Sequence, residues 1–199
     1  MTDGNVFVQE KRQGLISLSL KQSDSYMVQA FRDAIGSNKK LVVRKEDKEC
    51  SVQILSDHMT NTLIKYGVIP RKSGYETIPE FLEGDMLRHF LRGVFDGDGS
   101  PGFYNRPNRT AHRRYIAFCS ASHTMIEQIV SSMRQEIDVD PVKISNEHGV
   151  FIVRYVKNES VEKIINYLYK DATIYLTRKK ETCDKITSEI RQYRDNREG

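Results

Sequence analysis

The sequence contains few cysteines and lacks the long apolar runs of a membrane protein. Cys50, Cys119 and Cys183 are far apart and no CxxC pair occurs, so neither a zinc site nor a disulfide framework is indicated. No run of about 18 apolar residues exists, and the N-terminus has no signal peptide. We therefore expect free thiols and a reducing compartment without a membrane partner: the cytoplasm, or the nucleus or an organelle of a eukaryotic host.

The composition is that of a globular protein with a hydrophobic core. Of the 199 residues, 38% are hydrophobic and 29% are charged. The formal net charge of +4 is compatible with a nucleic-acid partner, although many unrelated proteins are equally basic. Composition alone therefore adds only modest weight to that interpretation.

The most informative segment is an apolar helical pattern, Met86–Phe95, followed by the acidic, glycine-containing turn Asp96–Gly99. Because the C-terminal end of a helix carries partial negative charge, carboxylates there are disfavoured by about 0.3–1 kcal/mol each. Two acids at that end need a compensating cation, and a hard divalent metal such as Mg²⁺ is the natural one. A calcium loop is not predicted, because Pro107 stands where the twelfth-position glutamate belongs. The remaining alternative is a solvated acidic turn.

The chain repeats one order of elements twice. The first half predicts a strand, a helix, a hairpin and a helix over residues 14–20, 26–35, 40–55 and 57–66. The second half predicts the same order over residues 114–119, 123–136, 142–156 and 160–169, and then a charged helix after Lys179. The capping serines Ser23 and Ser122 are 99 positions apart, and Lys72 and Lys179 are 107 apart. These similar offsets indicate a duplication with small loop insertions.

The repeat register assigns Asp3 as the partner of Asp98, 95 positions earlier. A lone Asp-Gly near a terminus is usually a turn, so only the register gives Asp3 a role. The apolar helix that precedes Asp98 has no counterpart before Asp3. Three explanations stay open: an upstream start, a fragmentary copy, or association of two chains through the remaining helix.

These segments resemble the LAGLIDADG homing endonucleases, in particular the single-chain branch with two repeats. The resemblance rests on residues 90–100, with Gly93 as the helix-packing glycine, on the element order of both halves, and on residues 67–73 and 168–179. It implies an α+β fold of two tandem, pseudo-symmetric αββαββα repeats, each with a curved antiparallel DNA-binding sheet. The first repeat would span residues 1–82, with its motif helix reduced to Asp3-Gly4, and the second would span residues 83–199.

The resemblance also implies a metal-dependent double-strand break at a long DNA site, as in intron or intein homing. Asp98 and Asp3, with Gly97, would bind Mg²⁺ or Mn²⁺, which can activate water and stabilise a leaving oxygen. Lys72 and Lys179 would stabilise charge at the phosphate, whereas by themselves they would be ordinary solvated lysines. No histidine occupies a shared repeat position, and no serine or cysteine group suggests nucleophilic catalysis.

Double-stranded DNA is the expected partner, because a β-ribbon fits the major groove, about 12 Å wide, where Arg, Lys, Asn and Gln pair with base edges. The side chains predicted to contact DNA are mostly polar or basic and lie near ribbon ends and repeat ends: Gln9, Lys11, Arg12, Gln13, Arg44, Lys45, Arg71, Tyr104, Asn105, Arg106, Arg109, Arg113 and Arg178. The alternative is that they are solvated hairpin tips. The rival functions are a catalytically inactive DNA-binding protein and an RNA maturase that acts on its host intron. Two repeats predict a monomer, or a dimer if the first helix is truly absent.

Overall fold

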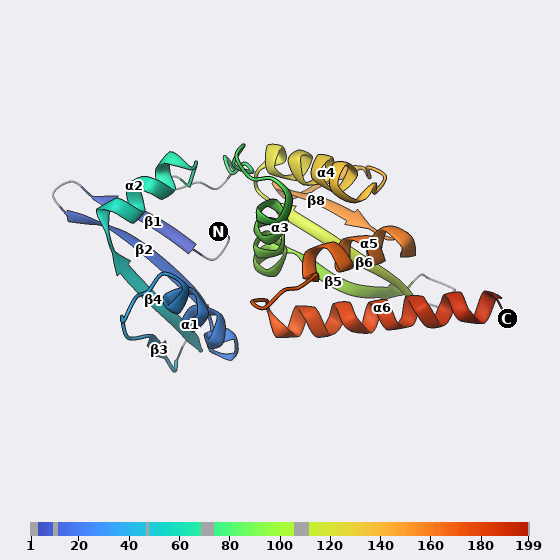
Figure 1. The fold of residues 1–199 in the computed structure, drawn as a ribbon, viewed down its shortest axis with the longest axis horizontal. Coiled ribbons are helices and arrows are strands. Elements are labelled where there is room, and N and C mark those ends of the chain that lie inside the picture. Colours follow the sequence, from blue (N-terminus) through green and yellow to red (C-terminus); the bar gives the residue numbers. More distant parts are fainter. Residues whose placement is uncertain (1–3, 10–11, 47, 69–73, 106–111, 199) are drawn as a thin grey trace. The chain divides into compact units, whose positions relative to one another are not determined.

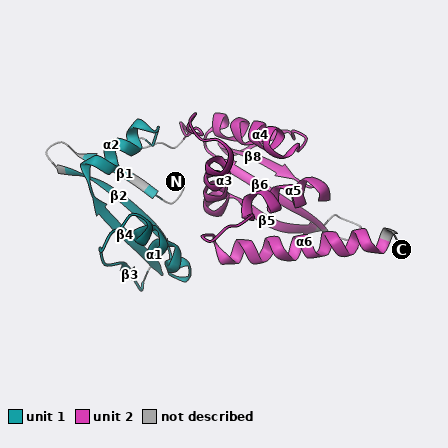
Figure 2. Cartoon of the chain, viewed as in Figure 1, with its two compact units in different colours: residues 1–72 teal, residues 73–199 magenta. Residues whose placement is uncertain are grey.

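The chain folds as two compact units in a computed structural model, residues 1–72 and residues 73–199 (Figures 1 and 2). The structure describes residues 4–9, 12–46, 48–68, 74–105 and 112–198. Within these ranges the undescribed side chains are those of Asn5, Gln9, Arg12, Asn105, His112, Arg197 and Glu198. Each unit has its own sheet and its own hydrophobic core.

The first unit is an antiparallel sheet with two helices packed on one face. Its strands are β1 (Gly4–Gln9), β2 (Arg12–Lys21), β3 (Val42–Arg44) and β4 (Glu49–Leu55), in the spatial order β1-β2-β4-β3. A 3-10 turn, Gln22–Asp24, leads into α1 (Ser25–Ala34), and α2 (Asp57–Lys65) follows β4. Alternate strand residues such as Ile16, Val52 and Ile54 are buried against the helices, as the period of two in a strand requires.

The second unit repeats this arrangement and adds a helix at each end. Its strands β5 (Ser100–Asn105), β6 (His112–Ser120), β7 (Ile144–Glu147) and β8 (Val150–Tyr155) pair in the order β5-β6-β8-β7. The helices α4 (His123–Ile137) and α5 (Asn158–Tyr169) follow β6 and β8, as α1 and α2 follow β2 and β4. Helix α3 (Gly84–Asp98) precedes the sheet, and α6 (Thr177–Glu198) follows it and packs against β5 and α5 (Figure 1).

The predicted α+β class and the duplication are confirmed, because both sheets have the same strand order and the same helix positions. Two local predictions were wrong. Ser23 does not cap a helix but lies in the 3-10 turn, so that Asp24 is the N-cap residue of α1 and makes no side-chain capping bond. The motif helix does not stop at Phe95 but continues through Asp98, so both acids lie within its last turn. Within the described part of residues 4–68, no helix corresponds to α3.

The segment before α3 packs with the second unit. The Ser122 hydroxyl donates to the Glu76 carbonyl at 2.6 Å, and the Ile78 N–H donates to the Gln128 side chain at 2.7 Å. Ile78 also belongs to the second core. The compact unit therefore begins at residue 73, whereas the boundary of the ancestral repeat after residue 82 stays a prediction.

The three cysteines are free thiols, of which Cys50 and Cys183 are buried and Cys119 is half-buried. Among the helices built by the described residues, none is long and apolar enough to cross a membrane.

Ser122 is predicted to stabilise the fold more than its repeat equivalent Ser23. Ser122 is buried, and its Oγ accepts from the Met125 N–H at 3.2 Å while donating to Glu76. Ser122→Ala should therefore lower the free energy of unfolding by about 1–2 kcal/mol. Ser23→Ala, at an exposed position without a capping bond, should change it by less than about 0.5 kcal/mol. Urea denaturation of the two full-length variants measures both values, and equal effects would contradict the assignment of the cap.

Candidate active site at the end of helix α3

The candidate site lies at the C-terminal end of α3, where the acidic motif occurs. One apolar face of this helix anchors it in the second core, with Leu91 and Phe95 fully buried. The Phe95 ring packs against Phe118 of β6, with centroids 5.3 Å apart. Gly93 lies on the exposed side, and nothing in the second unit comes within 4 Å of where its Cβ would lie. Its predicted role as a helix-packing glycine stays a prediction.

A second face of α3 is polar but also buried. Arg88 and Arg92 are 5% and 9% exposed, and both donate to backbone carbonyls around the α5–α6 connection. Arg92 donates to the Ile174 carbonyl at 3.1 Å and to the Leu168 carbonyl at 3.3 Å, and Arg88 donates to the Lys170 carbonyl. These charge-assisted hydrogen bonds, one of them to the carbonyl of the buried Leu168, hold the connection against α3.

Asp96 extends this polar face by one turn. It is 5% exposed, and its carboxylate accepts from the Tyr169 hydroxyl at 2.8 Å and from the Leu176 N–H at 3.1 Å. Burial raises the pKa of the Asp96 carboxyl, although the two hydrogen bonds and the cations Lys179 and Arg92 act in the opposite direction. Asp96 is therefore buried from solvent and fixes the backbone at Leu176, the residue just before α6.

Lys179, in the first turn of α6, caps the end of α3. Its ammonium donates to the carbonyls of Phe95 at 2.8 Å, Gly97 at 3.1 Å and Gly99 at 2.6 Å. The residue is 6% exposed, and an ammonium has three N–H donors for these three acceptors. A positive charge at a helix C-terminus is favourable. The cation that the acidic helix end requires is thus supplied by a lysine of the same chain.

Asp98, unlike Asp96, is exposed on the last turn of the helix. Its backbone carbonyl accepts from the Cys119 thiol of β6 at 2.8 Å. Burial and the negative charge of Asp98 raise the pKa of Cys119, so the thiol keeps its proton at pH 7. Gly99 has to be a glycine, because a Cβ there would lie 2.6 Å from the Phe95 carbonyl oxygen. Lys179, Cys119 and Gly99 thus fix the backbone on both sides of an exposed carboxylate.

A hollow of about 490 Å³ lies beside this turn. It is formed by the end of α3, the start of β5 and the first turns of α6, and its lining residues are Gly97, Gly99, Ser100, Pro101, Arg178, Lys179 and Thr182. Arg178 and the N-terminus of α6 give the hollow a positive character, which suits an anion such as a phosphate, whereas the Lys179 ammonium is bound to three carbonyls.

The residues present fit a hard divalent cation only in combination with a substrate. No group of three or more His, Cys, Asp or Glu side chains gathers within the described ranges, and Asp98 is the exposed carboxylate of the site. Mg²⁺ is commonly bound by one or two carboxylates, several waters and substrate phosphates, so Asp98 suffices as one protein ligand. The Gly97 carbonyl, the other ligand predicted here, accepts from Lys179.

Solved structures with this architecture match nearly the whole chain. The meganuclease I-SmaMI bound to uncleaveable DNA is 10% identical, with a TM-score of 0.69 over 98% of this chain and 87% of that one. The LAGLIDADG homing endonuclease I-LtrWI bound to target DNA is 10% identical, with a TM-score of 0.65 over the same shares. I-GzeII in complex with its DNA target is 12% identical, with a TM-score of 0.66 over 96% and 88%. The fold is that of the LAGLIDADG homing endonucleases. No protein-family model and no curated protein matches this chain by sequence.

The LAGLIDADG resemblance is thus confirmed at the level of the fold, but several predicted site residues lie outside the described residues. These are Asp3, Lys11, Arg71, Lys72, Arg106 and Arg109. For Gln9, Arg12 and Asn105 the strand is described and the side chain is not. In the first unit, Gln13 on β2 and Arg44 and Lys45 at the end of β3 are exposed. The roles of all these residues stay predictions.

In the second LAGLIDADG-type unit, Tyr104 and Arg113 are cross-strand partners on β5 and β6. They belong to the sheet face opposite the helices, because the alternate residues Ile116 and Phe118 are buried in the core. Sequence reasoning missed Tyr115 on the same face, which the period of two starting at Arg113 would have found. It also missed the polar face of α3, although Arg88, Arg92 and Asp96 follow a spacing of four within an apolar helix.

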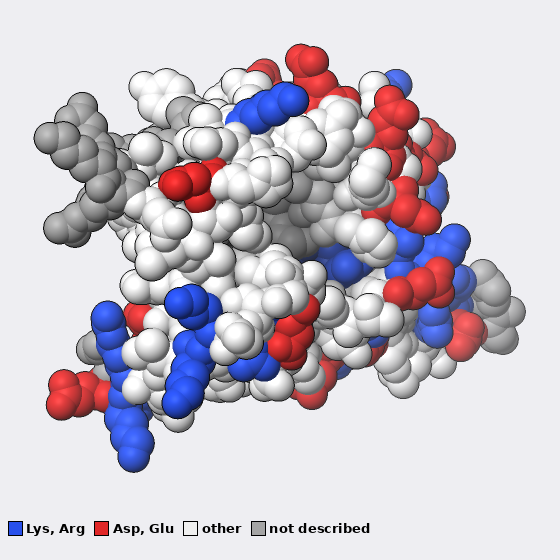
Figure 3. Space-filling view, turned by 60° about the vertical axis from the view of Figure 1, so that its left-hand side comes forward, with Lys and Arg blue, Asp and Glu red and all other residues white. Residues whose placement is uncertain are grey.

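On the face shown in Figure 3, charge alone does not mark a DNA-binding surface. Lys and Arg side chains alternate there with Asp and Glu, and broad uncharged areas separate them. The positions of the strands and of the acidic turn are therefore more informative than the net charge.

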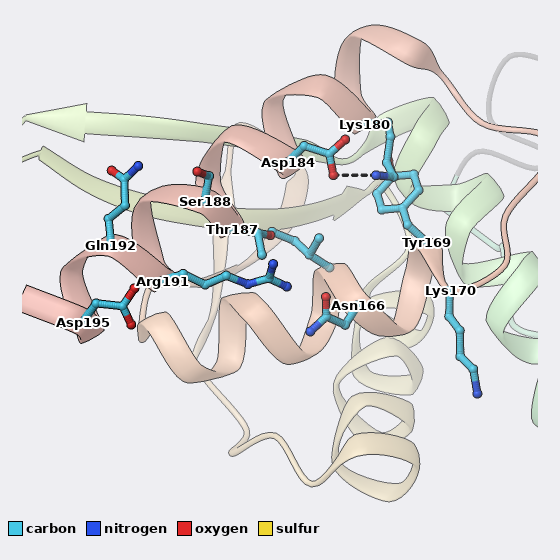
Figure 4. Close-up of a pocket in the computed structure, with 11 residues that line it drawn as sticks. Asn166, Tyr169, Lys170, Lys180, Asp184, Thr187, Ser188, Arg191, Gln192 and Asp195 are labelled. Atoms are coloured by element: carbon cyan, nitrogen blue, oxygen red, sulfur yellow. Dashed lines mark hydrogen bonds and ion pairs between the residues drawn. The ribbon is translucent and has the colours of Figure 1, made fainter. Parts of the chain in front are cut away.

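A second hollow, of about 480 Å³, lies between α5 and α6 (Figure 4). The side chains around it carry both signs of charge, and Lys180 pairs with Asp184 there. The Lys180 ammonium also lies 5.6 Å from the Tyr169 ring centroid. Neither Asp98 nor Lys179 lines this hollow, so it is distinct from the acidic end of the motif helix.

Lys179→Met is predicted to destabilise the second unit. Three carbonyls would lose a charged donor, and buried acceptors without a partner cost about 1–3 kcal/mol each, so we expect a loss of about 2–4 kcal/mol. The control is Lys180→Met, which removes the neighbouring lysine and its exposed ion pair and should cost less than about 1 kcal/mol. Urea denaturation of the full chain compares the two variants, and similar losses would show that Lys179 is not a cap.

Asp96 and Asp85 are predicted to make opposite contributions to the pH dependence of stability. Burial raises the pKa of Asp96 above that of the unfolded chain, about 3.8, so its contribution is favourable at low pH and is lost as the pH rises through the raised pKa. Asp85, in contrast, accepts a hydrogen bond from Arg88, which lowers the pKa of the Asp85 carboxyl. The contribution of Asp85 to stability is therefore present above about pH 3.8 and is lost as the pH falls.

The measurement is the free energy of unfolding between pH 3 and pH 7 for the wild type, Asp96→Asn and Asp85→Asn. As the pH rises from about 3.8, the wild type should become less stable relative to Asp96→Asn. As the pH falls, the wild type should become less stable relative to Asp85→Asn. If the stability difference between wild type and variant changed with pH in the same direction for both variants, the environments assigned to these two carboxyls would be wrong.

Proposed function

We propose that this chain is a site-specific DNA endonuclease that makes a metal-dependent double-strand break at a long recognition site, as in intron or intein homing. The observation that carries the proposal is the exposed carboxylate of Asp98, on a turn fixed by Lys179 beside a positive hollow. The LAGLIDADG fold supports it, because the solved structures of I-SmaMI and I-LtrWI contain DNA. A protein that only binds DNA, or an RNA maturase, would not need this acidic arrangement.

Asp98 would hold Mg²⁺ or Mn²⁺ together with a phosphate oxygen of the DNA, and Asp3 would offer the equivalent carboxylate of the first repeat. When bound, such a cation supplies a Lewis acid for the phosphoryl group and lowers the pKa of a coordinated water. Lys179 contributes rigidity: its three hydrogen bonds keep the Asp98 backbone in place before the substrate arrives. A ligand fixed in advance avoids reorganisation during the reaction.

Arg178 and the N-terminal turn of α6 would bind a phosphate of the cleaved strand. Arg178 lines the hollow next to the glycines of the acidic turn, and a guanidinium can donate to two phosphate oxygens at once. The partial positive charge at the N-terminus of α6 adds to this attraction. Lys72 would be the counterpart of Lys179 in the first repeat.

The uncovered faces of the two sheets would lie in the major groove, where base pairs are distinguishable. Tyr104 and Arg113 would contact DNA from the uncovered face of the second sheet and Asn105 from the end of β5, while Gln13, Arg44 and Lys45 would contact it from the first unit. A single chain with two repeats would then contact both halves of a long site as a monomer.

The test is cleavage of a plasmid library with random inserts by the full chain in the presence of Mg²⁺, followed by sequencing of the broken ends. Ends that share one long sequence are the expected result. Specific binding of a duplex without cleavage would instead identify an inactive DNA-binding protein, and tighter binding of structured RNA than of any duplex would identify a maturase. Either result would reject the endonuclease.

Asp98→Asn is predicted to reduce cleavage of the selected duplex by roughly 10²–10³-fold, because a neutral amide is a poor ligand for Mg²⁺. Its affinity for the same duplex in Ca²⁺ should change little, since the substitution leaves the sheet faces intact. Asp195→Asn, on the exposed C-terminal part of α6, is the control and should cleave like the wild type. Equal cleavage rates for the two variants would remove Asp98 from the active site.

A further inference from the structure

On the uncovered face of the second sheet, an arginine is stacked on an aromatic ring. The guanidinium carbon of Arg154, on β8, lies 5.4 Å from the ring centroid of Tyr115, on β6. Arg154 is exposed, whereas its neighbours Val153 and Tyr155 are buried in the core. Because successive strand residues point to opposite faces, the Arg154 side chain projects from the face that the helices leave open.

The ring beneath Arg154 is held in place by β5. A Cβ at Gly102 would come within 2.7 Å of the Tyr115 hydroxyl, so the end of the ring lies close over the backbone of β5 at this glycine. The Tyr104 ring lies 6.1 Å from the Tyr115 ring, centroid to centroid, and the Ser100 hydroxyl lies 3.4 Å from the Tyr115 hydroxyl. Tyr115 is thus a firm platform, which restricts the orientation of the guanidinium stacked on it.

We infer that Arg154 is a specificity-determining residue that recognises a guanine base in the major groove; this inference rests on the proposed function. The parallel N–H groups of a guanidinium match the O6 and N7 acceptors of guanine. Stacking on Tyr115 fixes the plane of the group in advance, so less side-chain entropy is lost on binding. Ser100, which stands in the same cross-strand row as Arg154, is small and exposed and leaves room for a base edge.

The position of this row also indicates where the guanine lies. β5 begins with Ser100, two residues after Asp98, and Cys119, two residues beyond Ala117 on β6, donates to the Asp98 carbonyl. The row of Ser100, Ala117 and Arg154 is therefore adjacent to the acidic turn. Because strand residues and stacked base pairs advance by about the same 3.3–3.4 Å, we expect the guanine beside the cut position and not at the outer end of the site.

The experiment is selection of bound duplexes from a random pool by the full chain in Ca²⁺, followed by affinity measurements on the selected duplex. The wild type should enrich guanine at one position next to the cut, and replacing that base pair should weaken binding by roughly 5- to 150-fold. Arg154→Ala and Arg154→Lys should both bind the original and the replaced duplex nearly equally. Arg154→Lys keeps the charge and the length, so it separates loss of the guanidinium geometry from loss of charge or of folding.

The control is Lys143→Ala, which removes an exposed cation just before β7 of the same sheet and should weaken all duplexes uniformly. Tyr115→Leu should reduce the guanine preference while Arg154 is still present. If the wild type selects a duplex and Arg154→Lys retains every base preference, the inference is wrong and the proposed function stands. If the wild type selects no duplex at all, both fail.

Discussion

The ammonium of Lys179 allows an acidic sequence to end helix α3. The carbonyls of Phe95, Gly97 and Gly99 converge at the C-terminal end of α3, where the helix carries a partial negative charge. The Lys179 ammonium donates a hydrogen bond to each of the three. With that charge balanced inside the protein, the two acids of the motif can take different environments: Asp96 is buried, and Asp98 is exposed. The electrostatic requirement that suggested a metal is thus met before a metal binds.

The position of Lys179 depends in turn on the buried polar face of α3. Arg88 and Arg92 bind carbonyls around the connection after α5, and Asp96 accepts the N–H of Leu176, the residue just before α6. The first turn of α6 therefore begins where a lysine side chain can reach the end of α3. Core packing, the α5–α6 connection and the exposed acid form one continuous set of contacts, which explains why a surface site is supported by so many buried polar groups.

The fold was predictable because its signals are local and occur twice: alternating strands, amphipathic helices and hairpin turns in one order. Asp98 and Lys179 were predicted as site residues from a motif and from the repeat register, and their catalytic roles stay predictions. The sequence could not show that Lys179 binds carbonyls, because a capping lysine and a solvated lysine have the same local pattern. The burial of Asp96 depends on Tyr169 and Leu176, which are 73 and 80 positions away. Arg154 was missed because its aromatic partner lies on another strand.

If the scissile phosphates lie beside Asp98, Fe²⁺ in place of Mg²⁺ should cut bound DNA there by releasing hydroxyl radicals in the presence of ascorbate and peroxide. On a duplex selected by the full chain, we expect strand breaks confined to a few adjacent nucleotides for the wild type. Asp98→Asn, bound to the same duplex at equal occupancy, should lose this localised cleavage. Breaks spread evenly along the duplex, or the same localised breaks with Asp98→Asn, would contradict the assignment of the α3 end as the catalytic centre.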